Sequence, residues 1–575
     1  MKTHDFRKGI AISLVSSLAI LASGAARADA TINIVNANLP GVGFNDPTPV
    51  APVGGNTGTT LGEQRLIAFR HGAALWGARL DSNVAINVSA TFEPLAPNVL
   101  GSAGAIDTFK DFPGSTRLYP GVEFAETWYG SALANKRAGA DLDSSNPEIR
   151  ARFSTNFNFY LGLDNNHGAQ VDLVAVVLHE LGHGLNFQTF VSSATGQNVD
   201  APAGNPDGGH TDIYARYLVD STNELHWNEM TAAQRQASAI KFGRLVWDGP
   251  NVFADLPDVL QLGSPEVRVT APPAIAGPYQ FGSAAFGPPV GSPNVVGNVV
   301  AAVDAAEPGG TTTDGCSPFS NAAVVAGSIV LIERGFCGFA VKARNATNAG
   351  AIAAVIYNQA ANVNAAPPGM ADDGINGAFV MIPTVSLTRA DGLAIVGQLG
   401  GGVAMSIGVD PAIRAGADSL ERARLYAPFP VVGGSSVSHY DTVAFPNLLM
   451  EPAINGDLTH NLEAPSDLTH ELLLDVGWFP DADLDGLADN LDSCPNSNLA
   501  PTIVIGVNNS GVPNGLFNTG CTMSDLIAQA ADAANNHGQF VSAVDALTTQ
   551  WKKAGLITGK QKDAIMSAAS KANIP

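Results

Sequence analysis

Apolar residues recur at every third or fourth position over residues 171–185, and this spacing predicts an amphipathic helix. The apolar stripe consists of Val171, Val174, Leu178, Leu181 and Leu185. Asp172 lies near the start of this segment, where a negative charge interacts favourably with the helix dipole. Residues 62–78 have the same helical spacing, whereas residues 85–92 and 149–153 alternate apolar with polar positions and are predicted to be strands. The N-terminal part of the chain is therefore expected to mix helices and strands.

A different pattern fills residues 265–408, which are rich in Ala, Gly, Val and Pro. Residues 327–337 contain an apolar run, residues 340–349 have helical spacing, and residues 351–358 form a second apolar run. This order predicts a strand, a turn, a helix and a strand, which together make a βαβ unit. At the C-terminus, residues 522–575 have helical spacing and are predicted to form a small helical module, to which the sequence assigns no chemistry.

The first thirty residues have the features of a secretory signal peptide. Lys2, Arg7 and Lys8 form a basic start, an apolar run follows over residues 10–22, and Ala28-Asp29-Ala30 is a cleavage site of small residues. The apolar run is too short to favour a retained membrane anchor. We expect a secreted or extracellular protein with no membrane span in its mature chain.

Length, charge and cysteines narrow the class of protein. The chain of 575 residues exceeds what one hydrophobic core supports, so several domains are expected. Its formal charge of −22 argues against binding to nucleic acid and suits an extracellular protein that binds calcium. An even number of cysteines in an exported chain favours two disulfides, and proximity in sequence favours the pairs Cys316–Cys337 and Cys494–Cys521.

Residues 179–183 read His-Glu-Leu-Gly-His and lie on the predicted helix. Residues four apart share a helix face, so His179 and His183 can point at one metal ion, with Glu180 beside it to handle a proton. Zinc is the expected metal, and hydrolysis of peptide bonds by an activated water molecule is the expected reaction. The alternative is a helix with ordinary solvated histidines, and the amphipathic pattern argues against it.

A catalytic zinc site needs a third protein ligand. The motif resembles that of the metzincins, in which a glycine turns the chain after HExxH so that a third histidine follows closely. Asn186 stands at that glycine position, and Asn tolerates the left-handed backbone that such a turn needs. Position 189 is Thr189, so no histidine follows closely and the ligand must come from elsewhere. The candidates include His210, Asp212, His226 and Glu224, and Glu224 would suit a gluzincin-type peptidase.

Residues 481–492 carry a second candidate metal site. Acidic residues at positions one, three and five, followed by Gly486 at position six, form the pattern of a calcium loop. Two more acidic residues fall at positions nine and twelve, so the candidate calcium ligands are Asp481, Asp483, Asp485, Asp489 and Asp492. A solvated acidic linker is the alternative.

Two stretches resemble the leishmanolysin-type metzincins. In that family the third histidine follows a long insertion in a Ser-His-aromatic-acid context, which Ser438-His439-Tyr440-Asp441 matches. Residues 447–452 are similar to the family's Met turn, and residues 468–478 to its closing helix. The resemblance implies a metalloendopeptidase in which His439 is the third zinc ligand and Met450 lies beneath the metal. Tyr440 is a candidate to assist the oxyanion. The chain departs from the family where Asn186 replaces a glycine.

Two further resemblances concern the insert and the acidic loop. The hallmark of the protease-associated domain is a strand ending in Arg-Gly-x-Cys-x-Phe, followed by Lys-Ala and Gly-Ala, and it is matched by Arg334, Gly335, Cys337, Phe339, Lys342, Ala343, Gly350 and Ala351. This resemblance implies a non-catalytic domain that binds substrate or regulates access to the site. The acidic loop is followed by Cys494-Pro495 and resembles one thrombospondin type 3 repeat, a calcium-binding module.

These observations predict an α+β multidomain protein with a metzincin-like catalytic domain interrupted by an α/β protease-associated domain. The expected parts are a signal peptide (1–30), the metallopeptidase domain (31–264 and 409–480), the protease-associated insert (265–408), a calcium-binding segment (481–521) and a C-terminal helical module (522–575). The expected function is a secreted zinc endopeptidase that acts on proteins or peptides. The alternatives are a gluzincin-type peptidase with Glu224 as ligand, or a calcium-dependent adhesion or matrix-binding protein with a degenerate peptidase core.

Overall fold

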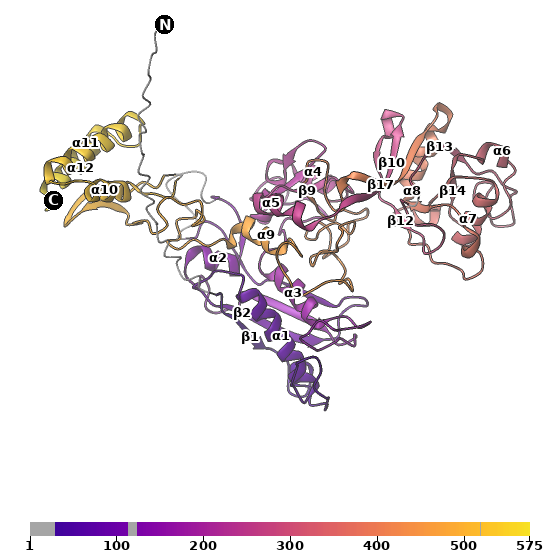
Figure 1. Ribbon diagram of the computed structural model, residues 1–575, viewed down its shortest axis with the longest axis horizontal. Helices are drawn as coiled ribbons and strands as arrows, with labels where there is room; N and C mark the ends of the chain where they lie inside the picture. Colours follow the sequence, from indigo (N-terminus) through magenta and orange to yellow (C-terminus); the bar gives the residue numbers. More distant parts are fainter. Residues whose placement is uncertain (1–28, 113–123, 292, 518, 575) are drawn as a thin grey trace, which may run out of the picture.

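The computed structural model describes residues 29–112, 124–291, 293–517 and 519–574. Figure 1 shows three parts in a row: a central body, an insert on one side of it, and a C-terminal module on the other. The predicted signal peptide falls almost entirely outside the described residues. Within the described part of the chain, no helix is both long enough and apolar enough to cross a membrane.

A four-stranded sheet with two helices forms the first half of the central body. The strand order is β1-β2-β6-β3, in which β1 (Ile32–Asn36), β2 (Ile86–Glu93) and β6 (Ile149–Ser154) are parallel and β3 (Gly101–Ala105) is an antiparallel edge strand. Helices α1 (Leu61–Gly77) and α3 (Leu173–Gly184) pack against each other, and α3 also packs along β3. The strands predicted at 85–92 and 149–153 are confirmed, since every second residue of β2 is buried.

Smaller elements complete the central body. Strands β4 (Thr108–Phe109) and β5 (Tyr129–Gly130) pair before helix α2 (Ser131–Ala138). A second sheet has the order β18-β9-β7-β8 and is formed by β7 (Leu218–Asp220), β8 (Leu225–His226), β9 (Leu245–Trp247) and β18 (Ala423–Arg424). The remaining helices are α4 (Ala232–Ser238), α5 (Pro250–Val259) and α9 (Thr469–Leu473).

One hydrophobic cluster joins the chain before and after the insert. It contains Leu178 and Trp247 from before the insert and Met450 and Leu472 from after it, all of them fully buried. Burial of apolar surface is the dominant favourable term in folding, so these distant segments belong to one core. The segments before and after the insert therefore share one hydrophobic core.

The insert is built on an eight-stranded sheet of order β11-β10-β17-β13-β14-β15-β16-β12. Its strands are β10 (Leu262–Ala271), β11 (Gly277–Pro278), β12 (Gly282–Ser283), β13 (Val295–Ala301), β14 (Ile329–Glu333), β15 (Ala353–Tyr357), β16 (Thr384–Leu387) and β17 (Ala404–Arg414). Strands β13 to β16 are parallel. Helix α6 (Ala322–Val325) connects β13 to β14, α7 (Phe339–Asn348) connects β14 to β15, and α8 (Arg389–Gln398) follows β16. The predicted βαβ unit is β14, α7 and β15. The long antiparallel pair β10–β17 connects the insert to the central body (Figure 1).

The C-terminal module is larger than the sequence predicts. Its helices are α10 (Met523–Asp532), α11 (His537–Lys553) and α12 (Gly559–Lys571). A hairpin of β19 (Thr502–Ile505) and β20 (Asn508–Pro513) shares their hydrophobic cluster through Ile503 and Val512. The compact unit thus includes residues that the sequence pattern grouped with the calcium-binding segment.

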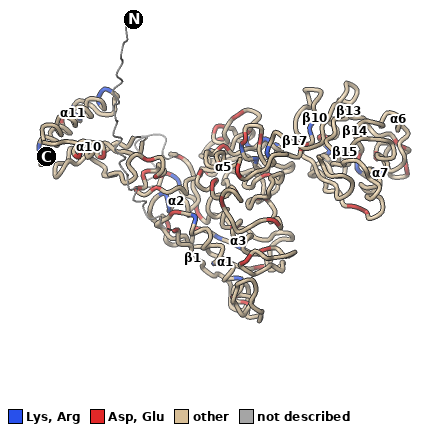
Figure 2. The backbone as a smooth tube through the Cα atoms, viewed as in Figure 1, with Lys and Arg blue, Asp and Glu red and all other residues tan. Residues whose placement is uncertain are grey.

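The predicted disulfides and the acidic character are both visible in the structure. Cys316 is bonded to Cys337 and Cys494 to Cys521, which confirms the pairing by proximity. Figure 2 shows acidic residues spread over all three parts, in line with 52 Asp and Glu against 30 Lys and Arg in the whole sequence.

Candidate metal centre

Helix α3 carries the His-Glu-Leu-Gly-His motif at its C-terminal end. The Asp172 side chain accepts a hydrogen bond from the main-chain N–H of Val174 at 2.8 Å and so caps the start of the helix. Every residue of α3 is buried, including the two histidines, so the surrounding structure holds the helix firmly. A buried helix fixes the direction of its side chains, and His179 and His183 both point to one side.

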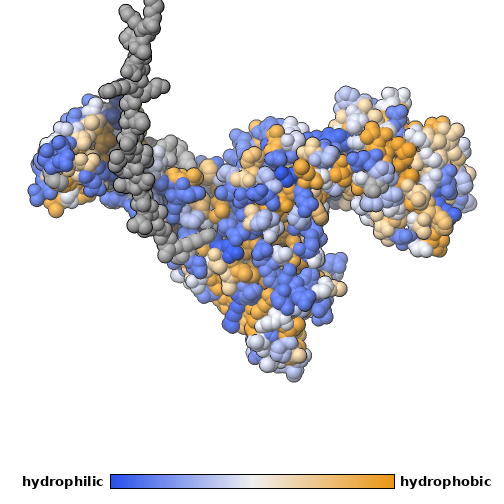
Figure 3. Space-filling view, viewed as in Figure 1, coloured by the Kyte–Doolittle hydropathy of each residue, from blue (hydrophilic) through white to orange (hydrophobic). Residues whose placement is uncertain are grey.

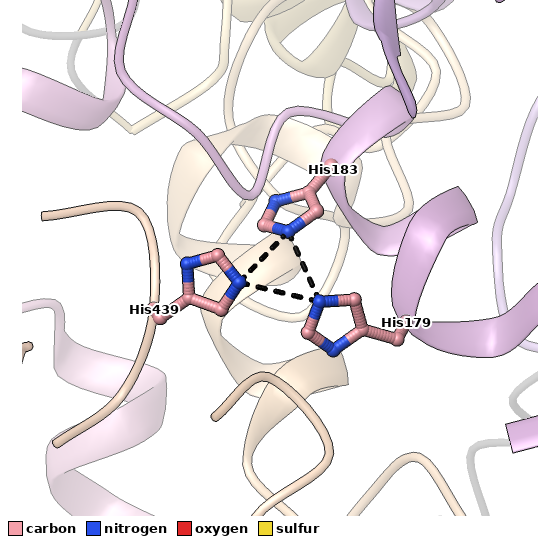
Figure 4. A group of neighbouring side chains, drawn as sticks. All are labelled: His179, His183 and His439. Carbon is pink, nitrogen blue, oxygen red and sulfur yellow. Dashed lines mark hydrogen bonds between the residues drawn. The ribbon is translucent and has the colours of Figure 1, made fainter. Parts of the chain in front are cut away.

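His439 completes a group of three histidines. It arrives from the loop after the insert, and its Nε2 atom lies 3.2 Å from Nε2 of His183 and 3.2 Å from Nε2 of His179. The Nε2 atoms of His179 and His183 are also 3.2 Å apart. Figure 4 shows the three rings converging on a common point with these atoms innermost. The third ligand implied by the family resemblance is therefore brought to the motif.

The hydrogen bond made by the outer nitrogen, Nδ1, determines which nitrogen of each ring carries the proton. Nδ1 of His179 lies 2.7 Å from the carbonyl oxygen of Leu449, Nδ1 of His183 lies 2.9 Å from that of Phe187, and Nδ1 of His439 lies 2.8 Å from that of Ser435. A carbonyl oxygen only accepts, so each Nδ1 carries a proton and donates it. In a neutral imidazole the other nitrogen, Nε2, then has a free lone pair.

Three lone pairs that face one another repel unless a cation lies between them. Burial lowers the pKa of His179 to about 4 and that of His183 to about 3. Burial and the two neighbouring histidines keep the pKa of His439 well below its usual value. The rings are thus neutral at pH 7, as metal ligands must be. Zinc–nitrogen bonds of about 2.0–2.1 Å in a tetrahedron place ligand atoms about 3.3–3.4 Å apart, close to the observed spacing.

Glu180 lies beside the three histidines. Burial raises its pKa to about 8, although a hydrogen bond from the main chain of Ala103 and the positive charge of Arg152 act in the opposite direction. A Cβ atom at Gly101 would lie 2.6 Å from Oε1 of Glu180, which is closer than real Cβ atoms come. Glycine at position 101 therefore lets the carboxyl group rest against the backbone of β3. The sequence does not predict this contact, because Gly101 and Glu180 lie on different elements and no local pattern of residues relates them.

The group opens into a cleft of about 850 Å³. One wall is β3 with the segment before it, and another is the loop around Gly433 and Gly434 that leads to His439. A third is formed by residues 452–454, which follow Met450. The three histidines and Glu180 all line this cleft, so a substrate placed in it would reach them together.

Two features of the expected turn are present around the motif. Asn186 has φ of 91°, the left-handed conformation proposed from the sequence, and its Oδ1 accepts a hydrogen bond from the N–H of Gly130 at 2.7 Å. Met450 is fully buried, and a Cβ at Gly182 would lie only 2.8 Å from its sulfur. Met450 thus packs directly against the motif helix.

Tyr440 does not reach the cleft. Its hydroxyl donates to the carbonyl oxygen of Leu468 at 2.9 Å, and its ring is buried against Phe187 at a centroid distance of 5.1 Å. The suggestion that Tyr440 assists an oxyanion is therefore wrong for this geometry, since its hydroxyl is already used inside the core.

The other candidate ligands lie in separate interactions. Glu224 is bound by the Arg422 guanidinium at 2.6 and 3.1 Å and is not part of the three-histidine group. His210 contacts Asp200, and His226 contacts Asp248 at 2.7 Å. Asp212 accepts hydrogen bonds from residues 189–191. The geometry does not support Glu224 as the third ligand.

In the acidic loop, three of the five candidate ligands converge. Carboxylate oxygens of Asp481, Asp483 and Asp485 lie within 4.8 Å of one another, whereas Asp489 and Asp492 are outside this group. Burial, with the neighbouring carboxylates, raises the pKa of Asp483 to about 6 and that of Asp485 to about 7. The Arg137 guanidinium already pairs with Asp481 at 3.1 Å. Oδ2 of Asp485 is buried without a hydrogen-bond partner among the described residues.

Comparison with known proteins identifies the insert. Residues 295–395 match the PA domain family. The chain is 40% identical over 87 residues to human ER degradation-enhancing alpha-mannosidase-like protein 3, which covers 15% of this chain and 9% of that protein. It is 51% identical over 51 residues to an aminopeptidase of Pseudomonas aeruginosa, which covers 9% of this chain and 10% of that one.

Among solved structures, a zinc aminopeptidase from Bacillus subtilis is 20% identical, with 27% of this chain and 35% of that chain covered and a TM-score of 0.19. The chain thus spans only about a tenth of the length of the curated relatives it matches. Matches this short do not extend the activities of those proteins to this one. The chain is a mixed α/β multidomain protein that contains a PA domain.

Proposed function

We propose that this protein is a zinc endopeptidase of the metzincin type. The observation that carries the proposal is the convergence of three neutral, buried imidazoles, each oriented by a main-chain carbonyl, at a spacing suited to tetrahedral zinc. The left-handed Asn186 and the packing of Met450 against Gly182 support the metzincin assignment. Similarity over short segments to an aminopeptidase fits the wider class of peptidases.

In the proposed reaction His179, His183 and His439 would hold zinc, which would polarise the substrate carbonyl and activate a water molecule. Glu180 accepts the proton of the attacking water and returns it to the leaving amine. Its carboxyl group can act as a base only when it is ionised, and a divalent cation close by favours ionisation. Contact with the backbone of β3 holds that carboxyl group in place.

Digestion of casein by the full chain tests this function, with zinc content measured on the same samples. Glu180→Gln should retain zinc and lose activity by about 10²–10⁴-fold, the usual contribution of a general base. Glu126→Gln changes an exposed carboxylate outside the cleft and serves as the control. Cleavage that persists in a chelator, or full activity in Glu180→Gln, would contradict the proposal.

We further propose that Asp481, Asp483 and Asp485 bind calcium as a structural ion. The unpartnered Oδ2 of Asp485 and the raised pKa values of Asp483 and Asp485 support a cation-binding site at this loop. Because Arg137 compensates one carboxylate, two negative charges remain to attract the ion.

Export and a role for the PA insert complete the proposal. Two disulfides and the basic and apolar start of the chain favour secretion. The insert exposes large apolar side chains, including Ile375, Phe379 and Met381, and Figure 3 shows hydrophobic areas on its visible face. Exposed apolar areas of this kind are typical of surfaces that contact other proteins, so the insert is proposed to bind protein substrates or regulate their access.

A further inference from the structure

The cleft contains one cationic side chain among the described residues that line it. Apart from the three histidines and Glu180, its lining is uncharged except for Arg152 of β6. The side chain of Arg152 lies on the solvent face of the sheet, next to the edge strand β3, and is 45% exposed. Arg152 and Glu180 line the same cleft. A positive charge in this position attracts negatively charged groups that lie along β3.

The guanidinium of Arg152 has spare binding capacity. Its Nη2 donates to Oγ of Ser102 at 3.5 Å, and its Nη1 lies 3.7 Å from Oε1 of Glu93. Both distances are long for these contacts, and a guanidinium has five N–H donors arranged in a planar fork. The fork can therefore bind a carboxylate from a substrate without giving up a strong internal bond.

We propose that Arg152 is a specificity-determining residue that selects substrates with an acidic side chain at a fixed position relative to the scissile bond. The inference rests on the proposed peptidase function and adds the charge class of the substrate. Since Arg152 contacts Ser102 of β3, the selected acidic residue is one that lies along β3 in the bound substrate. Elsewhere the chain is strongly acidic, so the preference comes from this local cation.

The test uses fluorogenic peptides that share one sequence and carry Glu, Gln or Lys at each position in turn. For the zinc-loaded full chain, kcat/KM at one position should be about fivefold higher with Glu than with Gln, as expected for a partly exposed ion pair. Arg152→Gln should remove this ratio, and Arg152→Glu should favour the Lys peptide. Arg150→Gln is the matched control, because Arg150 is exposed on the same face of β6 but does not line the cleft.

A second readout does not depend on turnover. Binding of the same peptides to the inactive Glu180→Gln protein should show the same preference for Glu, and the preference should weaken at high salt because screening reduces exposed ion pairs. Glu93→Gln removes the competing carboxylate and should enlarge the ratio. Cleavage of the Glu and Gln peptides with equal kcat/KM at every position would overturn the role of Arg152 and leave the peptidase function intact. Failure to cleave any peptide would overturn the peptidase function, and equal binding of the Glu and Gln peptides would overturn the role of Arg152.

Discussion

Nδ1 of His179 lies 2.7 Å from the carbonyl oxygen of Leu449, the residue before Met450. This contact joins the motif helix to a segment that follows the PA insert in the sequence. The N–H of Leu449 in turn donates to the buried carboxylate of Asp467 at 2.7 Å. The side chain of Asp467, far from the motif in the sequence, thus fixes the main chain that orients one of the three histidines.

The first prediction concerns the identity of the third ligand. His439→Ala should weaken zinc binding by more than about a hundredfold, because loss of a partner of a ligand alone costs about 10–100-fold. Glu224→Ala should leave bound zinc unchanged, since Glu224 pairs with Arg422. His460→Ala is the histidine control, because that side chain contacts Asp172 instead. The zinc content of each of the three variants is measured after dialysis against a weak chelator. Loss of zinc in Glu224→Ala alone would show that Glu224, and not His439, is the third ligand.

A second prediction follows from the close approach of β3 to Glu180. Gly101→Ala places a methyl group where the Glu180 carboxylate lies, so kcat/KM should fall on the order of a hundredfold or more while zinc stays bound. In Gly104→Ala, on the same strand, the new atom would lie 3.3 Å from the flexible end of Gln188, and activity should change little. Equal activity of the two variants would show that the carboxyl group has room to move.

The third prediction concerns pH and a buried carboxyl group in α9. Burial raises the pKa of Glu471 to about 8, and Oε2 has no hydrogen-bond partner in the described part of the chain. The folded state therefore holds this proton more tightly than the unfolded chain, whose pKa is about 4.3. The stabilising contribution of the protonated group is complete below about pH 4 and is lost as the pH rises toward 8.

Urea unfolding at pH 6 and pH 8 measures this contribution. The free energy of unfolding should fall with rising pH by up to about 1.4 kcal/mol per pH unit for one such proton. Glu471→Gln should reduce that slope and be more stable than the parent at pH 8, whereas Glu126→Gln should keep the parent's slope. A parent protein that becomes more stable between pH 6 and 8 would contradict the assignment.

Local patterns in the sequence predict the motif helix, a favourable negative charge near its start and the left-handed Asn186, because each depends on residues within one or two turns. His439 is 256 residues from His183, and no periodicity connects them, so only family resemblance pointed to it. The carbonyl groups that orient the rings have no side-chain signature. The β19–β20 hairpin was missed because its second strand, Asn508–Pro513, is rich in Asn, Gly and Pro and lacks apolar alternation.

The last prediction tests the acidic loop. Extracellular calcium modules bind calcium with dissociation constants of about 10⁻⁴–10⁻³ M. With a dissociation constant in this range for the acidic loop, calcium at 10 mM should raise the free energy of unfolding of the part of the chain that contains Asp485 by about 1–3 kcal/mol. The shift in thermal unfolding should be larger at pH 8 than at pH 5.5, because the pKa values of Asp483 and Asp485 are raised to about 6 and about 7 and calcium must displace their protons.

Asp485→Asn should remove the calcium-dependent shift, since this carboxylate belongs to the converging group and has a buried oxygen without a hydrogen-bond partner among the described residues. Asp489→Asn tests whether calcium needs the five carboxylates suggested by the sequence or only the three that converge. Oδ1 of Asp489 accepts a hydrogen bond from the N–H of Ala482 at 2.8 Å, so this carboxylate already has a partner within the loop. A shift that survives in Asp489→Asn and disappears in Asp485→Asn would assign the ion to the buried group. An identical melting temperature with calcium and with chelator would instead indicate that Arg137 alone balances these carboxylates.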